Sequence, residues 1–204
     1  TDYHDRVEVA CRSLVETSPP PIDPMCLEGV AGDGAGDRSL WDFLQFGGPV
    51  LRSDRLVTLS EELNLASCHS IGEMIAKFAD SLRSHIEYRP NVTHAHSTSD
   101  DALKAGAGVC QDLAHISLGL LRLHGVPCRY VSGYLHVENP SKPSESHAWI
   151  EFWSAEHGWV PFDPTHGSSV GEQHVVVGYG RQYDDVPPNR GIFRGAAEES
   201  LAVE

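Results

Sequence analysis

The sequence lacks two features that would direct it to a membrane or to a nucleic acid. It holds no run of about 18 apolar residues, so no segment is long enough to cross a bilayer as a helix. It is also poor in basic residues: 15 lysines and arginines stand against 29 acidic residues, for a formal net charge of −14. Such a surface repels phosphate backbones and anionic lipid headgroups, so we expect neither a nucleic-acid nor a membrane partner. The opening residues, 1 to 6, are polar and do not resemble a secretory signal.

Cysteine is scarce as well, and the few thiols are scattered. Five occur, at positions 11, 26, 68, 110 and 128, and no two form a CxxC pair. An odd, sparse set indicates reduced thiols in a cytoplasmic protein and argues against a structural zinc site, which usually takes closely paired ligands. His94 and His96 share a polar loop, but zinc needs at least three protein ligands and no third is visible. We therefore expect no metal and no other cofactor.

The chain is long enough for one sizeable domain of mixed structure. Its 204 residues allow one α/β domain with at most a small appendage. Residues 7 to 15 favour a strand, and a proline-rich break at residues 19 to 24 separates it from the rest of the chain. Because a strand needs a partner, residues 1 to 20 are predicted to pair within this domain or to be left from a preceding β domain. Residues 21 to 68 are expected to form a loop-rich lead-in with one short helix near residues 39 to 46.

Helices fill the middle of the chain. Ser70 and Glu73 form a capping box, and apolar residues recur at helical spacing for several turns after them. A short helix over residues 99 to 104 precedes a second long one, which begins at Cys110 and ends before Gly125. Apolar side chains cover most of the circumference of this last helix, so we expect it to be buried centrally.

Strands follow the helices. We predict them over residues 129 to 135, 146 to 153, 159 to 163 and 173 to 177, with an edge strand at residues 191 to 194. The segments between them are rich in Asn, Pro, Ser and Gly, which favour turns. Helices first and strands afterwards is the order of an α+β fold, in which N-terminal helices pack on an antiparallel β-sheet.

Cys110 differs from the other four thiols in its position. It begins a helix and follows Gly106 and Gly108. A helix N-terminus carries unpaired N–H groups and about half a positive charge, which favour the reactive thiolate and can hold the oxyanion formed when a carbonyl is attacked. The two glycines are expected to let a substrate backbone come close. We therefore predict that Cys110 is a nucleophile, whereas most lone cysteines are small buried hydrophobic residues.

A nucleophilic thiol needs a base, and the strand at residues 146 to 153 offers one at its start. Alternation along that strand places His147 and Trp149 together on the face opposite the core. The next predicted strand ends in Asp163, and antiparallel pairing across the tight loop at residues 154 to 158 brings Asp163 back toward His147. An aspartate there can fix the imidazole tautomer and stabilise the imidazolium.

Further residues receive roles from their position near these three. Asp112 and His115 share a face of the nucleophile helix that points away from the thiol, and we expect a buried polar pair that supports the helix. Gln111 and Trp149 are predicted to contact the substrate, with the Gln111 amide as a hydrogen-bond donor to the oxyanion. His166 is expected in a solvated surface loop.

Three segments together resemble the bacterial transglutaminase-like core. They are Gly-Ala-Gly-Val-Cys-Gln-Asp-Leu-Ala-His at residues 106 to 115, Ser-His-Ala-Trp-Ile-Glu at 146 to 151 and Gly-Trp-Val-Pro-Phe-Asp-Pro-Thr at 158 to 165. The resemblance implies a papain-like fold with Cys110 on the helix and with His147 and Asp163 on the sheet. It also implies chemistry without a metal, and a catalytic core over residues 69 to 204.

The resemblance implies acyl transfer through a thioester, and the acceptor stays open. Water makes a peptidase or amidase acting on a protein or peptide, which we favour because nothing in the chain marks a lysine-binding site. A primary amine makes a transglutaminase. A non-catalytic binding module with the same fold and, more remotely, a zinc enzyme using His94 and His96 are the alternatives.

Overall fold

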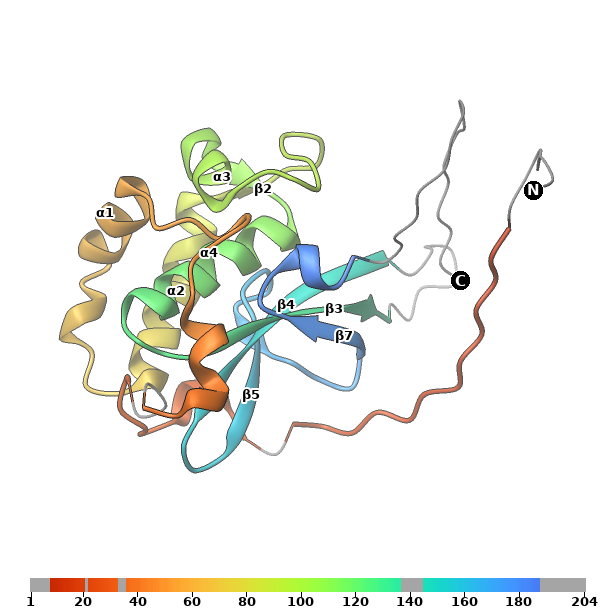
Figure 1. Cartoon of the computed structure of the whole chain (residues 1–204), viewed down its shortest axis with the longest axis horizontal. Helices are drawn as coiled ribbons and strands as arrows, with labels where there is room; N and C mark the ends of the chain where they lie inside the picture. The colour runs from red at the N-terminus through yellow and green to blue at the C-terminus, as the bar shows by residue number, and fades with distance from the viewer. Residues whose placement is uncertain (1–7, 21, 33–35, 137–144, 188–204) are drawn as a thin grey trace.

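Helices gather on one side of an antiparallel sheet, as Figure 1 shows. The computed structural model describes residues 8–20, 22–32, 36–136 and 145–187. The α+β fold predicted from the order of elements, with helices packed on an antiparallel sheet, is confirmed in these ranges. None of the described helices is long and apolar enough to span a membrane.

The main sheet is built from the second half of the chain. Its strands are β3 (Cys128–Leu135), β4 (Glu145–Ser154), β5 (Gly158–Asp163), β6 (Ser168–Ser169) and β7 (His174–Gly180). Their spatial order is β6-β5-β4-β3-β7, and all neighbours run antiparallel. β4 and β5 pair across the predicted tight loop, with Trp153 opposite Trp159. The four main predicted strands are confirmed, while the edge strand predicted at residues 191 to 194 lies outside the described residues.

Most of the described helices precede this sheet. The α-helices are α1 (Asp54–Glu62), α2 (Ile71–His85), α3 (Ser99–Ala105) and α4 (Cys110–Leu123). Short 3₁₀ segments are η1 (Pro24–Cys26), η2 (Arg38–Leu44), η3 (Leu65–Ser67) and η4 (Tyr183–Asp185), and β1 (Glu87–Tyr88) pairs in parallel with β2 (Ala107–Gly108). Three predicted helices are confirmed as α2, α3 and α4. Ser70 caps α2 as expected, since its hydroxyl accepts the N–H of Glu73 at 3.1 Å.

The lead-in at residues 21 to 68 holds more structure than the sequence predicts. The expected short helix is the 3₁₀ segment η2, whereas η1, α1 and η3 are additional. Leu56 and Leu59 of α1 are buried, and the hydroxyl of Ser53 caps the helix by accepting the N–H of Leu56 at 3.3 Å. Two buried leucines in nine residues give too weak a periodicity to be recognised in the sequence, so packing against the rest of the domain decides this helix.

The strand predicted over residues 7 to 15 is not formed. Residues 8 to 20 belong to no strand, and Figure 1 shows this segment, in red, running along the outside of the domain. Val9 and Leu14 are 89% and 103% exposed. An alternating pattern gives no strand without a partner edge, because pairing is what stabilises it. The other expectation, that residues 1 to 20 are left from a preceding β domain, stays a prediction.

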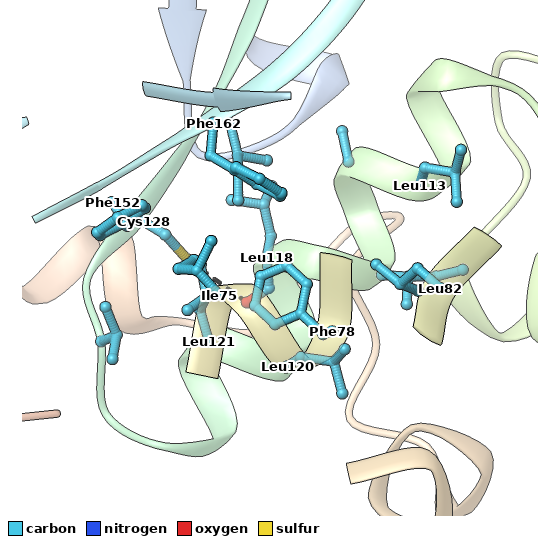
Figure 2. Close-up of a cluster of buried hydrophobic side chains, with 14 of the residues drawn as sticks. Ile75, Phe78, Leu82, Leu113, Leu118, Leu120, Leu121, Cys128, Phe152 and Phe162 are labelled. Atoms are coloured by element: carbon cyan, nitrogen blue, oxygen red, sulfur yellow. Dashed lines mark hydrogen bonds between the residues drawn. The ribbon is translucent and has the colours of Figure 1, made fainter. Parts of the chain in front are cut away.

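The main hydrophobic core lies between α2, α4 and the sheet (Figure 2). Phe78 of α2 meets Phe162 of β5 edge to face, with ring centroids 5.8 Å apart. Leu118, Leu120 and Leu121 of α4 are fully buried, which confirms that this helix runs through the centre of the domain. Burial of side chains of this size stabilises the fold by about 1.5–3 kcal/mol each. The core therefore holds the first residues of α4 at a fixed place beside the sheet.

One charged residue of α4 is buried with these leucines. Arg122 is 4% exposed, and its guanidinium donates to the carbonyls of Phe43, Gln45, Cys128 and Arg181 at 2.6–3.1 Å. A buried cation is tolerated when its donors are all directed at acceptors. The four carbonyls come from the lead-in, from β3 and from the chain after β7, so one side chain joins three distant parts of the sequence.

Candidate active site

Cys110 is the first residue of α4, and the start of this helix is capped from within. The Asp112 carboxylate accepts the N–H of Val109 at 2.8 Å and the hydroxyl of Thr93 at 2.6 Å. In the part of the chain that the structure describes, neither the Cys110 amide nor the Gln111 amide has a hydrogen-bond acceptor. Two N–H groups of a helix N-terminus are thus free beside a half-buried thiol, where they can stabilise an oxyanion.

The structure brings Cys110, His147 and Asp163 together. Nε2 of His147 lies 2.8 Å from Oδ2 of Asp163, which leaves Nδ1 for the Cys110 thiol, the other group that acts on this imidazole. Burial lowers the pKa of His147, but the hydrogen bond to Asp163 and the influence of the Cys110 thiol outweigh it and raise this pKa to about 9. The imidazolium is therefore stabilised, as a thiolate–imidazolium pair requires.

Asp163 ends β5, and its fully buried carboxylate collects hydrogen bonds from several directions. Its Oδ2 lies 2.8 Å from Nε2 of His147, 2.7 Å from Nδ1 of His166 and 3.0 Å from Nε2 of His174. Its Oδ1 accepts the backbone N–H of Thr165 at 2.9 Å. Burial raises the pKa of a carboxyl, but the three histidines hold the pKa of Asp163 well below its usual range. The side chain is an ionised anchor for three imidazoles.

His174, the first residue of β7, has a defined tautomer. Its Nδ1 accepts the backbone N–H of Gly171 at 3.1 Å, so the proton of the neutral ring sits on Nε2, the atom that faces Asp163. Only 8% of the His174 side chain is exposed. The ring is therefore a buried hydrogen-bond donor to Asp163 that is available whatever the protonation state of His147.

Sequence reasoning missed both His166 and His174. His166 is half exposed, in line with the predicted surface loop, but its Nδ1 contacts Asp163 and corrects the expectation of a merely solvated side chain. The sequence signal that could have revealed His166 is the turn after β5. An aspartate whose carboxylate accepts the N–H two residues later commonly forms a turn, which brings the following residues back toward it. No local signal points to His174, since its contact depends on β7 lying beside β3.

The site also contains a set of potential metal ligands. Their ligand atoms lie within 4.8 Å of one another, and the residues are His147, Asp163, His166 and His174. Ligation through Nε2 of His174 would move its proton to Nδ1, against the N–H of Gly171, so four-fold coordination conflicts with the hydrogen bonding. We interpret the cluster as imidazoles bonded to one anion. His94 and His96 belong to no group of three potential ligands among the described residues.

Trp149 is closed off from solvent, which corrects the prediction that it contacts the substrate. The side chain is fully buried and packs with Val131 and Val170. Its ring centroid lies 6.0 Å from that of His147 and 5.2 Å from that of His174. Strand alternation places Trp149 on the same side as His147, as predicted, but β7 and the chain after β6 cover this side. Trp149 therefore packs against the imidazoles of His147 and His174 and helps to hold them in place.

Asp112 and His115 are buried as predicted, but no hydrogen bond joins them. Asp112 caps the helix, whereas Nε2 of His115 accepts the N–H of Tyr183 at 3.3 Å and its ring lies 5.2 Å from that of Tyr130. Burial, together with the nearby charge of Arg122, lowers the pKa of His115 to about 3, so the ring is neutral. The expected polar pair is thus two separate supports, one at the start of α4 and one further along it.

Gln111 is oriented by the loop that precedes α3. Its Nε2 donates to the carbonyl of Ala95 at 3.1 Å, which fastens this loop to the nucleophile helix. An amide group has a second N–H, so donation to an oxyanion is compatible with this contact. That role for Gln111 stays a prediction.

Gly106 and Gly108, which precede Cys110, have structural roles besides the expected access for the substrate. Gly106 ends α3 with a φ of 61°, in the left-handed region that glycine favours. A Cβ on Gly108 would lie 2.7 Å from the side chain of Asp112. The spacing of the two glycines therefore serves the turn and the helix cap that position the thiol.

A cleft of about 420 Å³ opens beside His147. It is formed where α2, β1 and α4 face the ends of β3 and β4 and the turn after β5. The residues that line it are Arg83, Ile86, Tyr88, Leu113, Leu135, Ser146, His147, Thr165 and His166. Its volume lies within the range of pockets that bind small ligands or side chains.

Comparisons with known proteins give a family match and several relatives. Residues 58–164 match the model of the Transglutaminase-like superfamily. An uncharacterised Mycobacterium leprae protein is 42% identical over 147 residues, which are 69% of this chain and 52% of that protein. A protein-glutamine gamma-glutamyltransferase of Pseudomonas aeruginosa is 30% identical over 172 residues, which are 78% of this chain and 25% of that enzyme. This chain thus spans about half the length of the mycobacterial relative, 52%.

Two solved structures share the fold. A candidate cysteine protease from Cytophaga hutchinsonii gives a TM-score of 0.68 at 25% identity, over 81% of this chain and 55% of that one. The periplasmic domain of TgpA from Pseudomonas aeruginosa gives a TM-score of 0.50 at 25% identity, over 64% of this chain and 48% of that one. Together with the family match, the first likeness confirms the fold expected from the sequence.

Proposed function

Because the chain belongs to the transglutaminase-like superfamily, we propose that it catalyses cysteine-dependent acyl transfer on peptide amides, with water as the final acceptor. The observation that carries the proposal is the position of His147, whose Nε2 lies 2.8 Å from Oδ2 of Asp163 and whose pKa is also raised by the Cys110 thiol. The Cys110 thiol lies at a helix N-terminus, where two backbone N–H groups are free to stabilise an oxyanion. These are the parts that a cysteine nucleophile needs: a base, a group that orients the base, and an oxyanion site.

The proposed reaction has two steps. The Cys110 sulfur attacks the amide carbonyl, and the C–N bond breaks while Nδ1 of His147 gives its proton to the leaving amine. A water molecule then attacks the thioester, gives a proton to His147 and releases the acid as the C–S bond breaks. Asp163 stays ionised throughout and keeps Nδ1 of the imidazole directed at the sulfur.

Two observations bear on the acceptor. The relation to a protein-glutamine gamma-glutamyltransferase supports an amine, and transamidation is our second candidate. The cleft beside the site supports water, since none of the described residues that line it is an Asp or Glu that could pair with a cationic lysine side chain. The likeness to a candidate cysteine protease points in the same direction. We therefore favour hydrolysis.

The expected partner is a protein or peptide substrate, and this stays a prediction. The structure joins no two of the five cysteines, and the reduced state expected from their spacing stays a prediction. The cytoplasmic location inferred from that spacing also stays a prediction, and one similar structure is a periplasmic domain.

The nucleophile can be tested by comparing two cysteines. We expect iodoacetamide to label Cys110 faster than Cys68, which is similarly half-buried but lies beside Lys77 and not beside a histidine. Cys110→Ala should abolish cleavage of an internally quenched peptide mixture, and Cys68→Ala should leave it unchanged. Equal labelling of the two thiols, with no cleavage by the wild type, would support a non-catalytic binding module instead.

The acceptor can be tested by adding an amine. Products are identified by mass spectrometry with and without excess methylamine. Hydrolysis predicts free acids in both reactions, with methylamides as a minor product. Product that forms only with the amine would reject the hydrolase and establish the transglutaminase.

A further inference from the structure

Among the described residues that line the cleft beside His147, one side chain, Arg83, is permanently charged, and its sign is opposite to that of the chain. The sequence has 29 acidic residues and 15 basic ones, yet these described lining residues include this arginine and no Asp or Glu. Low-dielectric walls focus the field of a charge that lines a cleft. The cleft therefore attracts anions on a protein whose surface generally repels them.

Arg83 is held in place but retains free donors. It lies in the last turn of α2, and its Nη1 donates to the carbonyl of His166 at 3.3 Å. No carboxylate within the described ranges forms an ion pair with it, and Glu87 of β1, four residues later, pairs with Arg89 at 3.7 Å. A guanidinium has five N–H donors, so most of those of Arg83 remain available for a ligand.

The other walls set the shape of that ligand. Ile86 and Leu113 are 3% and 2% exposed and, with Leu135, give the cleft apolar sides. Leu113 lies one helical turn after Cys110, so the cleft is close to the thiol. A substrate group that occupies the cleft would therefore be joined to the substrate close to the carbonyl that the thiol would attack. His147 lines the same cleft. The ligand that fits is an apolar stem that ends in an anion.

We propose that this cleft is a specificity site for a carboxylate carried on an apolar stem next to the scissile amide, with Arg83 as the residue that recognises it. The proposal rests on the proposed acyl-transfer function and adds a substrate class to it: acidic peptides. A glutamate side chain and a free C-terminal carboxylate share this chemistry. Planar guanidinium groups bind either by paired N–H···O bonds.

The experiment compares matched peptides. One pair differs by Glu against Gln beside the scissile bond, and a second pair differs by a free against an amidated C-terminus. In one of the two pairs, we expect the wild type to prefer the charged peptide over its neutral partner by about fivefold in kcat/KM, as for an ion pair at a partly exposed site. Arg83→Gln should abolish that preference and Arg83→Lys should keep part of it. Arg89→Gln, an arginine outside the lining residues, should leave it intact.

Binding provides a readout that does not depend on turnover. With Cys110→Ala, the charged peptide should bind about fivefold more tightly than its neutral partner, and the added substitution Arg83→Gln should remove the difference. A neutral peptide preferred over the charged one, or a preference that survives Arg83→Gln, would overturn the proposal. Binding that depends on Arg83 without any cleavage by the wild type would reject the acyl-transfer function and retain the carboxylate site.

Discussion

Nε2–H of His174 points at Oδ2 of Asp163 across 3.0 Å because the N–H of Gly171 occupies the other ring nitrogen. The carboxylate that orients His147 is thus itself oriented by a second histidine. His174 is not among the described residues that line the cleft, so we assign it as a positioning residue for the proposed chemistry.

Replacement of His174 should separate hydrogen bonding from packing. A hydrogen bond to a charged group contributes about 1.5–3 kcal/mol, so His174→Leu should lower kcat about tenfold or more. His174→Gln can keep an N–H at the position of Nε2 and should recover most of the rate. Rates and thermal unfolding are measured for both variants. Equal loss of activity in the two, at equal stability, would show that the donor is unimportant.

The stability of the protein should depend on pH through His147. Its pKa is about 9 in the folded protein against an ordinary value of 6.5, so the folded state binds this proton more tightly. The contribution of the His147 proton to the free energy of unfolding is therefore complete below pH 6.5 and is lost as the pH rises through 9. Urea unfolding over this range should show a decline for the wild type that is weaker in His147→Gln. The same decline in both proteins would contradict the assignment.

The cap of the nucleophile helix should be sensitive to one methyl group. Gly108→Ala places a Cβ 2.7 Å from Asp112 and should destabilise the protein by about 1–3 kcal/mol while misplacing the thiol. Gly47→Ala is the control, because a Cβ there meets nothing within 4 Å. Urea unfolding and the iodoacetamide rate of Cys110 are measured for both. An unchanged labelling rate in Gly108→Ala would show that the cap does not position the sulfur.

Arg122 should matter far more for stability than an exposed arginine. Arg122→Met leaves four carbonyls without their donor and should cost about 3 kcal/mol or more. Arg55→Met removes an exposed pair with Asp100 and should cost less than about 1 kcal/mol. Denaturant midpoints compare the two. Similar losses would mean that methionine packing replaces the hydrogen bonds of the guanidinium.

The sequence predicted the parts of the site that depend on local geometry. A helix N-terminus identifies Cys110, and hairpin pairing across a short loop brings Asp163 to His147. Burial of Asp112 and His115 follows from the position of their helix face. Each of these inferences spans few residues or one regular element, so periodicity is enough to make it.

The features that the sequence did not reveal depend on contacts between distant segments. Trp149 is buried rather than open to substrate because Val170 and His174, which come later in the chain, pack against it. His174 reaches Asp163 only because β7 returns to the edge beside β3. The strand predicted at residues 7 to 15 fails for the same reason, since alternation does not specify a partner.

The partners of Arg122 also determine when the protein can finish folding as it is made. The ribosome releases Phe43 and Gln45 before Arg122 itself, but Arg181 only long after it. Until Arg181 is made, the Arg122 guanidinium lacks one of its four carbonyl acceptors and is better solvated by water than buried. Nascent chains that stop before residue 181 should therefore be held open and remain targets for chaperones and proteases.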